Sequence, residues 1–259
     1  MQRRQFLQSS VLAATAIGTG IEASSTEDQK TGKEFYEWRE YDMRFGSDQS
    51  QLENYFKTAL IPALNKNGIK TVGVFKELSK SEPAKIYLLI PYSGMDNYAS
   101  VNAKLRMDEE FKKNSQAYNA IGADKPLYNR FSSWFMNAFD GMPKLIVPAN
   151  QPRIFELRTY EGYSEDAVAR KIRMFNEGEF PIFYRTGLTP VFFGEVISGK
   201  NLPCLTYMIT FKNLEERDKN WAAFGADADW KKLLADPQFA NTVSNIIKIF
   251  LEPTAYSQV

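Results

Sequence analysis

The sequence contains no histidine and a single cysteine, Cys204. The absence of histidine excludes Ser-His-Asp and Cys-His catalysis, histidine-ligated haem and every zinc site with a His ligand. One cysteine excludes an intrachain disulfide and a thiolate metal cage, and no basic neighbour indicates an activated thiolate. Metal binding could come only from oxygen ligands, and no loop has calcium-type spacing. We therefore expect neither a metal nor a cofactor.

The chain also lacks an excess of charge of either sign. Its 259 residues include 32 Lys and Arg and 31 Asp and Glu, which gives a net charge of +1. Such a balance offers no bulk electrostatic attraction to nucleic acid or to an anionic membrane. We expect a small-molecule ligand, no nucleic-acid partner and no stable membrane anchor, and we leave a homodimer open.

The apolar stretch near the N-terminus, Val11 to Ile21, is too short to span a membrane, which takes about 20 residues. It follows Arg3-Arg4-Gln5-Phe6-Leu7, which resembles a twin-arginine export signal. A basic tail before an amphipathic stretch is the alternative interpretation. We predict an export signal at residues 1–23, a linker at 24–33, and a periplasmic or otherwise exported protein.

An internal repeat is the main positive feature of the sequence. The residues Glu37, Arg39 and Tyr41 recur 119 positions later as Glu156, Arg158 and Tyr160. The same offset also matches Phe56 with Phe175, Pro62 with Pro181 and Gly68 with Gly187. A nearly constant offset, with residue types in the same order, indicates two tandem copies of one unit.

Each copy begins with a strand and a helix. Alternating residues predict strands at 35–43 and 154–161. Ser47 or Asp48 in the first copy and Ser164 in the second are the expected helix N-caps.

The two helical regions also share a proline and a glycine at matching positions. Pro62 and Pro181 should kink or restart the helix, and Gly68 and Gly187 should end it. Two strands, a Lys-rich helical region and a closing strand follow in each copy.

The resulting order, β-α-β-β-α-β, is that of a ferredoxin-like unit. We predict an α+β fold with one unit at residues 34–139, a linker at 140–152 and a second unit at 153–259. Because such a unit covers only one sheet face with helices, the open faces should pack sheet to sheet as an intrachain α/β barrel.

Strand alternation places Glu156, Arg158 and Tyr160 on one face of their strand, opposite a Phe-Leu face. We expect the Phe-Leu face to contact helices and the ionic face to point into the barrel. In the functional interpretation these three residues are catalytic: Arg holds an anion, Glu takes a proton and Tyr donates one. In the structural alternative they are ion pairs that fix the barrel.

Candidate ligand-binding residues occupy the matching face of the first copy: Glu37, Arg39 and Tyr41. Arg185, two residues before Gly187, is a fourth candidate. In the alternative interpretation, Arg185 is a solvated cation that stabilises the C-terminal end of its helix by interacting with the helix dipole.

The second copy resembles the NIPSNAP family. The resemblance rests on Phe155-Glu156-Leu157-Arg158-Thr159-Tyr160, on Pro181, Arg185 and Gly187, and on Asp227-Ala228-Asp229-Trp230. It covers most of residues 153–256 and, more loosely, 34–139. The first copy departs from the pattern with Lys66 for Arg185 and Phe111 for Trp230. If a site needs those side chains, only the second copy is complete.

The resemblance implies a dimeric α/β-barrel type of ferredoxin-like fold. The wider fold group includes cofactor-free monooxygenases and haem enzymes, and fold alone does not select among activities. Our first hypothesis is an exported protein that binds a small anionic or carbonyl-bearing molecule in a polar-lined barrel. A cofactor-independent monooxygenase or isomerase, and a non-catalytic protein-interaction module, are the alternatives. Whether the protein is an enzyme stays open.

Overall fold

The computed structural model describes residues 32–79 and 82–259 of the chain, and all elements below belong to the compact unit Gly32–Val259. The predicted export signal at residues 1–23 and most of the linker at 24–33 lie outside the described residues. In the part of the chain that the structure describes, no helix has the length and apolarity needed to cross a membrane.

The first half of the unit runs strand, helices, two strands, helices, strand. Its elements are β1 (Phe35–Met43), α1 (Gln49–Tyr55), the π-helical turn η1 (Phe56–Leu60), α2 (Ile61–Lys66), β2 (Gly73–Glu77), β3 (Lys85–Tyr92), α3 (Met95–Met107), α4 (Glu109–Asn114), α5 (Gln116–Asn119) and β4 (Tyr128–Ala138).

The second half repeats this order. Its elements are β5 (Ile154–Glu161), α6 (Glu165–Met174), the π-helical turn η2 (Phe175–Glu179), α7 (Phe180–Thr186), β6 (Thr189–Ser198), β7 (Cys204–Phe211), α8 (Leu214–Ala226), α9 (Ala228–Ala235), the 3₁₀ turn η3 (Pro237–Phe239) and β8 (Asn245–Pro253).

The first helix of each half begins and ends where the sequence indicates. Asp48 caps α1 by accepting a hydrogen bond from Ser50 N at 2.8 Å, and Ser164 caps α6 through Ala167 N at 3.2 Å. At the far end, Gly187 follows α7 with φ of 78°, a left-handed conformation that glycine adopts without a Cβ penalty.

A π-helical turn precedes each helix proline. Phe56 O accepts from Ile61 N and Phe175 O accepts from Phe180 N, five residues on, directly before Pro62 and Pro181. A proline ring clashes with the carbonyl four residues earlier and donates no hydrogen bond to it. The wider turn gives the ring room, so the helix continues through the proline instead of ending.

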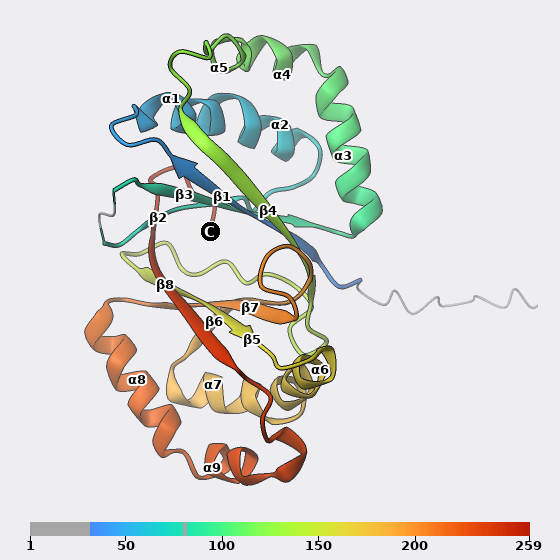
Figure 1. Ribbon diagram of the computed structural model, residues 1–259, viewed down its shortest axis with the longest axis vertical. Coiled ribbons are helices and arrows are strands. Elements are labelled where there is room, and N and C mark those ends of the chain that lie inside the picture. Colours follow the sequence, from blue (N-terminus) through green and yellow to red (C-terminus); the bar gives the residue numbers. More distant parts are fainter. Residues whose placement is uncertain (1–31, 80–81) are drawn as a thin grey trace, which may run out of the picture. The chain divides into compact units, whose positions relative to one another are not determined.

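The eight strands form a closed antiparallel barrel in the order β1-β3-β2-β8-β5-β7-β6-β4. The pairs β2·β8 and β4·β6 are the two seams between the halves. Helices α1 to α5 cover the first half and α6 to α9 cover the second, with the strands between the two helical layers (Figure 1). The expected α+β barrel is therefore confirmed, and closure pairs every sheet edge.

The large buried side chains inside the barrel are mostly apolar, and here one prediction is wrong. The residues buried inside come from both halves and include Tyr36, Trp38, Phe155 and Leu157. The Glu-Arg-Tyr face points the other way, into the layer between sheet and helices, where Tyr41 and Tyr160 join the two helix-side clusters. The expectation that the ionic face lines the barrel is thus contradicted.

The reason lies in what covers each face. Two sheets meet inside the barrel, and that space offers few polar partners, so it suits the larger apolar side chains. The helix layer brings its own cations and donors, as the contacts of Glu156 show. Strand alternation separates the two faces but does not say which one receives such partners.

Candidate functional site

The carboxylate of Glu156 is fully buried and carries four hydrogen bonds. Its Oε1 accepts from Arg158 Nη1 at 2.9 Å and from Arg217 Nη2 at 3.1 Å. Its Oε2 accepts from Arg217 Nε and from Trp221 Nε1, both at 2.9 Å. Arg217 and Trp221 are four residues apart on α8 and so share one helix face. The lone pairs of this carboxylate are all in use.

This environment sets the protonation state of Glu156. Burial alone raises the pKa of a carboxyl, but hydrogen bonds from Arg217 and Trp221 and the charge of Arg158 hold the pKa of Glu156 below its ordinary value. A general base near neutral pH needs the opposite shift. The predicted role of Glu156 as a proton acceptor stays a prediction, and this geometry favours an ion-pair role.

In the first half, Glu37 and Arg39 form a two-bond pair. Arg39 Nε and Nη2 donate to Glu37 at 2.7 and 2.9 Å. Ser133 Oγ and the Tyr92 hydroxyl add bonds of 2.7 and 3.2 Å to the same carboxylate. The predicted ligand-binding pair is thus brought together and satisfied by its own neighbours.

The two tyrosines of the triplets are packed under helices. Tyr41 contacts Phe56 edge-on at 5.2 Å between ring centroids. The Tyr160 hydroxyl bonds the Tyr207 hydroxyl at 2.8 Å, and burial raises the pKa of both phenols. Neither tyrosine reaches the barrel interior.

Arg185 lies outside both clusters. Its guanidinium is exposed and binds Asp227 at 2.6 and 2.8 Å and Asp229 at 2.9 Å. Asp227 is the N-cap of α9, so Arg185 joins the end of α7 to the start of α9. The structure does not bring Arg185 to the other predicted site residues.

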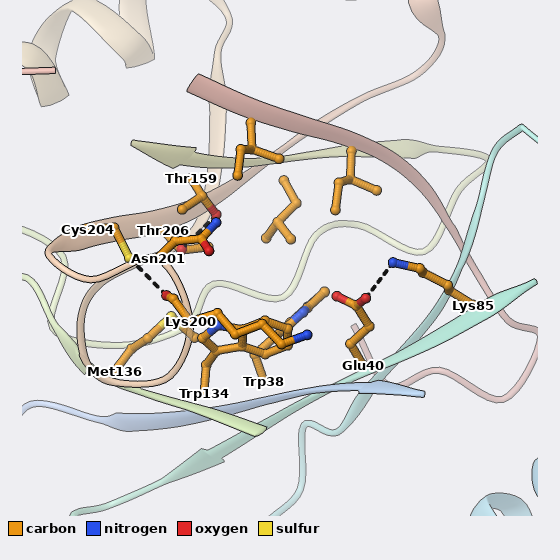
Figure 2. Close-up of a pocket in the computed structure, with 13 residues that line it drawn as sticks. Trp38, Glu40, Lys85, Trp134, Met136, Thr159, Lys200, Asn201, Cys204 and Thr206 are labelled. Atoms are coloured by element: carbon orange, nitrogen blue, oxygen red, sulfur yellow. Dashed lines mark hydrogen bonds and ion pairs between the residues drawn. The ribbon is translucent and has the colours of Figure 1, made fainter. Parts of the chain in front are cut away.

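A pocket of about 260 Å³ opens inside the barrel, on the face opposite the triplets (Figure 2). Both halves line it: Trp38, Glu40, Lys85, Trp134, Met136, Leu157, Thr159, Lys200, Asn201, Cys204, Thr206, Ile247 and Ile249. Its lining combines apolar and aromatic side chains with a few polar and charged groups, which is typical of small-molecule sites.

The three charged residues of this barrel pocket differ in their partners. Lys85 Nζ pairs with Glu40 at 2.5 Å and lies 3.7 Å from Asp42. Lys200 Nζ lies 5.3 Å from the centre of the Trp134 ring (Figure 2). Within the described residues no carboxylate pairs with Lys200. The pocket therefore has one uncompensated cation.

The barrel pocket also contains hydrogen-bond donors that have no acceptor within the described residues. Trp38 is 4% exposed, yet within the described residues its indole N–H has no hydrogen-bond partner. The hydroxyls of Thr159 and Thr206 bond each other at 2.9 Å, which leaves one of the two hydroxyl hydrogens unused. Each of these groups lines the pocket, so its unused hydrogen can be donated to an acceptor-bearing ligand.

Cys204 also lines the barrel pocket and is buried there. Its Sγ lies 3.7 Å from Lys200 O. Burial and then the charge of Glu161 raise its pKa to about 11, so the group is a neutral thiol at pH 7. In the described residues no group of three or more Cys, Asp or Glu side chains is placed to hold a metal ion.

Sequence reasoning missed this pocket because its residues carry no repeated motif. Trp38 and Glu40 alternate with the triplet residues on β1, and Leu157 and Thr159 do so on β5. The available signal was Glu40, a charge on an otherwise aromatic face near a strand end. Lys200 and Asn201 come from the β6–β7 loop, which no pattern marked.

The fold and the pocket define an eight-stranded α+β barrel with an internal small-molecule-sized cavity. Residues 155–258 match the NIPSNAP family model, so the chain carries a NIPSNAP domain in its second half. No curated protein sequence matches the chain significantly.

Three solved structures are similar over both halves. A candidate monooxygenase from Fusobacterium nucleatum is 10% identical and has a TM-score of 0.56, with 86% of this chain and 93% of that chain covered. One from Lactobacillus acidophilus is 8% identical, also with a TM-score of 0.56, over 85% and 94%. An anthrone oxidase-like protein is 8% identical with a TM-score of 0.52, over 86% and 92%. At these identities the likeness establishes the fold alone.

Proposed function

We propose that this protein binds a small anionic or carbonyl-bearing molecule in the barrel pocket. The observation that carries the proposal is that one pocket lining holds both Trp38, whose indole N–H has no partner within the described residues, and Lys200, which pairs with no carboxylate there. A ligand with acceptor oxygens satisfies both groups, and the apolar wall of Leu157, Ile247 and Ile249 takes its body.

A screen of small carboxylates, ketones and amides by thermal shift and native mass spectrometry tests this proposal. A ligand at 100 times its Kd adds about 2.7 kcal/mol to the free energy of unfolding, which raises Tm by several degrees. Ile247→Trp, which fills the pocket from β8, is the matched control. The proposal predicts hits that the filled variant loses. A screen without hits, or hits that Ile247→Trp retains, contradicts it.

Turnover by a cofactor-independent monooxygenase or isomerase is the second candidate. It draws support from the fold shared over both halves with two candidate monooxygenases and an anthrone oxidase-like protein. Oxygen uptake driven by a phenolic compound, and lost in Arg158→Met without loss of fold, supports this candidate. The saturated carboxylate of Glu156 favours binding over such chemistry.

We also propose that the two halves are tandem ferredoxin-like copies. In support, Arg39 lies opposite Leu88 and Arg158 opposite Tyr207, so both strand pairs keep the offset of 119. A circular permutant that begins at residue 153 and joins Val259 to residue 34 should fold with the same spectrum, because the copies are then interchangeable in order. Failure of the permutant to fold argues against independent copies.

Export through the twin-arginine pathway is our proposal for residues 1–23. It rests on Arg3-Arg4-Gln5-Phe6-Leu7 ahead of an apolar stretch. The paired change Arg3→Lys and Arg4→Lys should leave the protein in the cytoplasmic fraction of a producing bacterium. Unchanged export of that variant rejects the proposal.

A further inference from the structure

We propose that Lys200 makes the barrel pocket selective for organic anions over neutral carbonyl compounds. This inference rests on the proposed function and narrows its ligand class. The structure offers a direct internal comparison, because two lysines line one pocket and only one of them is neutralised.

Lys85 already forms an ion pair with a neighbouring carboxylate. It pairs with Glu40 at 2.5 Å, and this carboxylate and the charge of Asp42 raise the pKa of Lys85 above its ordinary value, although burial opposes them. The pair carries no net charge into the pocket. An arriving anion gains little from Lys85, because it must compete with a carboxylate already in place.

Lys200 has no ion-pair partner within the described residues. Its ammonium lies over the Trp134 ring at 5.3 Å, an interaction that an exposed lysine gives up at small cost. Its own partner set within the described residues contains no carboxylate. The charged residues that line the pocket, Glu40, Lys85 and Lys200, sum to one positive unit, and the neighbouring Asp42 lies beside Lys85 at 3.7 Å, so Lys200 is the lining cation that an anion can pair with and an amide cannot.

The backbone holds Lys200 in this place. Gly199 has φ of +151°, and a Cβ there would lie 2.0 Å from Trp134 Cδ1, so the loop can rest on the indole only with glycine. Asn201, with φ of 62°, turns the chain back toward β7. The β6–β7 loop thereby places one cation in the same pocket lining as Trp38, Thr159 and Thr206.

Matched pairs of carboxylate and amide, such as benzoate and benzamide, test the inference by titration followed through tryptophan fluorescence. Wild type should bind the carboxylate more tightly by about tenfold or more, since a charge-assisted hydrogen bond contributes roughly 1.5–3 kcal/mol. Lys200→Met should abolish that preference and leave amide binding within about twofold.

Two controls separate local from general charge effects. Lys212→Met removes a charge from an exposed lysine that pairs with Glu216 at 3.8 Å, outside the pocket lining, and should keep the wild-type preference. The double change Glu40→Gln and Lys85→Met removes a neutral pair and should keep the ratio, whatever its effect on both affinities.

The outcomes distinguish the two proposals. If the pairs bind and amides bind as tightly as carboxylates, or if Lys200→Met keeps the preference, the proposed role of Lys200 in anion selectivity is overturned and the proposed function stands. If no compound of either kind binds, the proposed function itself fails. Loss of the preference in Lys200→Met alone supports both.

Discussion

At the scale of single residues, the repeated Glu-Arg-Tyr triplet has a structural environment in both halves. The carboxylate of Glu37 accepts two hydrogen bonds from Arg39. The carboxylate of Glu156 accepts hydrogen bonds from Arg158, Arg217 and Trp221. Removing one partner from a buried ion pair leaves the other charge without compensation. The triplets should therefore contribute to folding before they contribute to any chemistry.

Glu156→Gln should lower the free energy of unfolding by about 2–4 kcal/mol at pH 7. Asp218→Asn, which removes an exposed partner of Arg217, is the matched control and should cost less than about 1 kcal/mol. Denaturant unfolding measures both. Equal stability of the Gln variant and wild type, combined with lost turnover, would instead establish a catalytic Glu156.

The same variant has a defined pH dependence. Because the folded pKa of Glu156 is depressed below its ordinary value of 4.5, its stabilisation is full above that pH and is lost as the pH falls through the folded pKa. The stability gap between wild type and Glu156→Gln should therefore narrow below about pH 4.5. A gap that widens on acidification contradicts this assignment.

A second buried pair, Lys171 with Glu179, occurs only in the second half of the described chain. At the same positions relative to the π-helical turn, the first half has Leu52 and Leu60. Lys171→Leu or Glu179→Leu alone should cost about 3–5 kcal/mol, and the double change should be nearly neutral or stabilising. A double-mutant cycle by denaturant unfolding measures the coupling. Additive losses contradict the expectation.

At the scale of elements, the strands and the helix ends could be predicted well from the sequence. Strict alternation predicts residues 35–43 and 154–161, and the strands occupy Phe35–Met43 and Ile154–Glu161. Ser164 as an N-cap and Gly187 as a C-cap also follow from local chemistry, because each depends on atoms within a few residues.

Two element-level features could not be predicted. The π-helical turns before Pro62 and Pro181 depend on whether the surrounding packing keeps the helix going past a proline. The orientation of β5 depends on Arg217 and Trp221, about 60 residues away in the sequence. Both faces of the strand are buried, so burial pattern alone did not choose between them.

The β6–β7 loop gives a prediction at this scale. Gly199→Ala should displace the loop from Trp134, because the added Cβ meets the indole ring and the backbone has a positive φ. We expect a loss of about 1–3 kcal/mol, altered tryptophan fluorescence and weaker ligand binding. Gly225→Ala in α8, where a Cβ meets open space, is the control and should gain up to about 1 kcal/mol. Unaltered fluorescence and binding in Gly199→Ala would contradict the close contact between the β6–β7 loop and Trp134.

At the scale of the compact unit Gly32–Val259, closure of the barrel creates the candidate site. The seams β2·β8 and β4·β6 bring the two halves around one interior, so Trp38 and Lys85 of the first face Leu157 and Thr206 of the second across the pocket. The first half supplies Trp38, Trp134 and the Glu40–Lys85 pair, while the second supplies Lys200 and the apolar wall of Leu157, Ile247 and Ile249. The family match to residues 155–258 therefore covers only one side of the pocket.

Modification of Cys204 tests the central claim most directly, since it is the only cysteine in the sequence and lines the pocket. The measurement is its rate of reaction with a small methanethiosulfonate at pH 9, where the fraction of thiolate is about 1% for a pKa of about 11. Sucrose, which stabilises folded proteins by exclusion from their surface, controls for general stabilisation. We predict that each ligand that raises Tm slows the reaction in proportion to occupancy, beyond any effect of sucrose. Ligands that raise Tm but leave the rate unchanged would place binding outside the barrel and contradict the account.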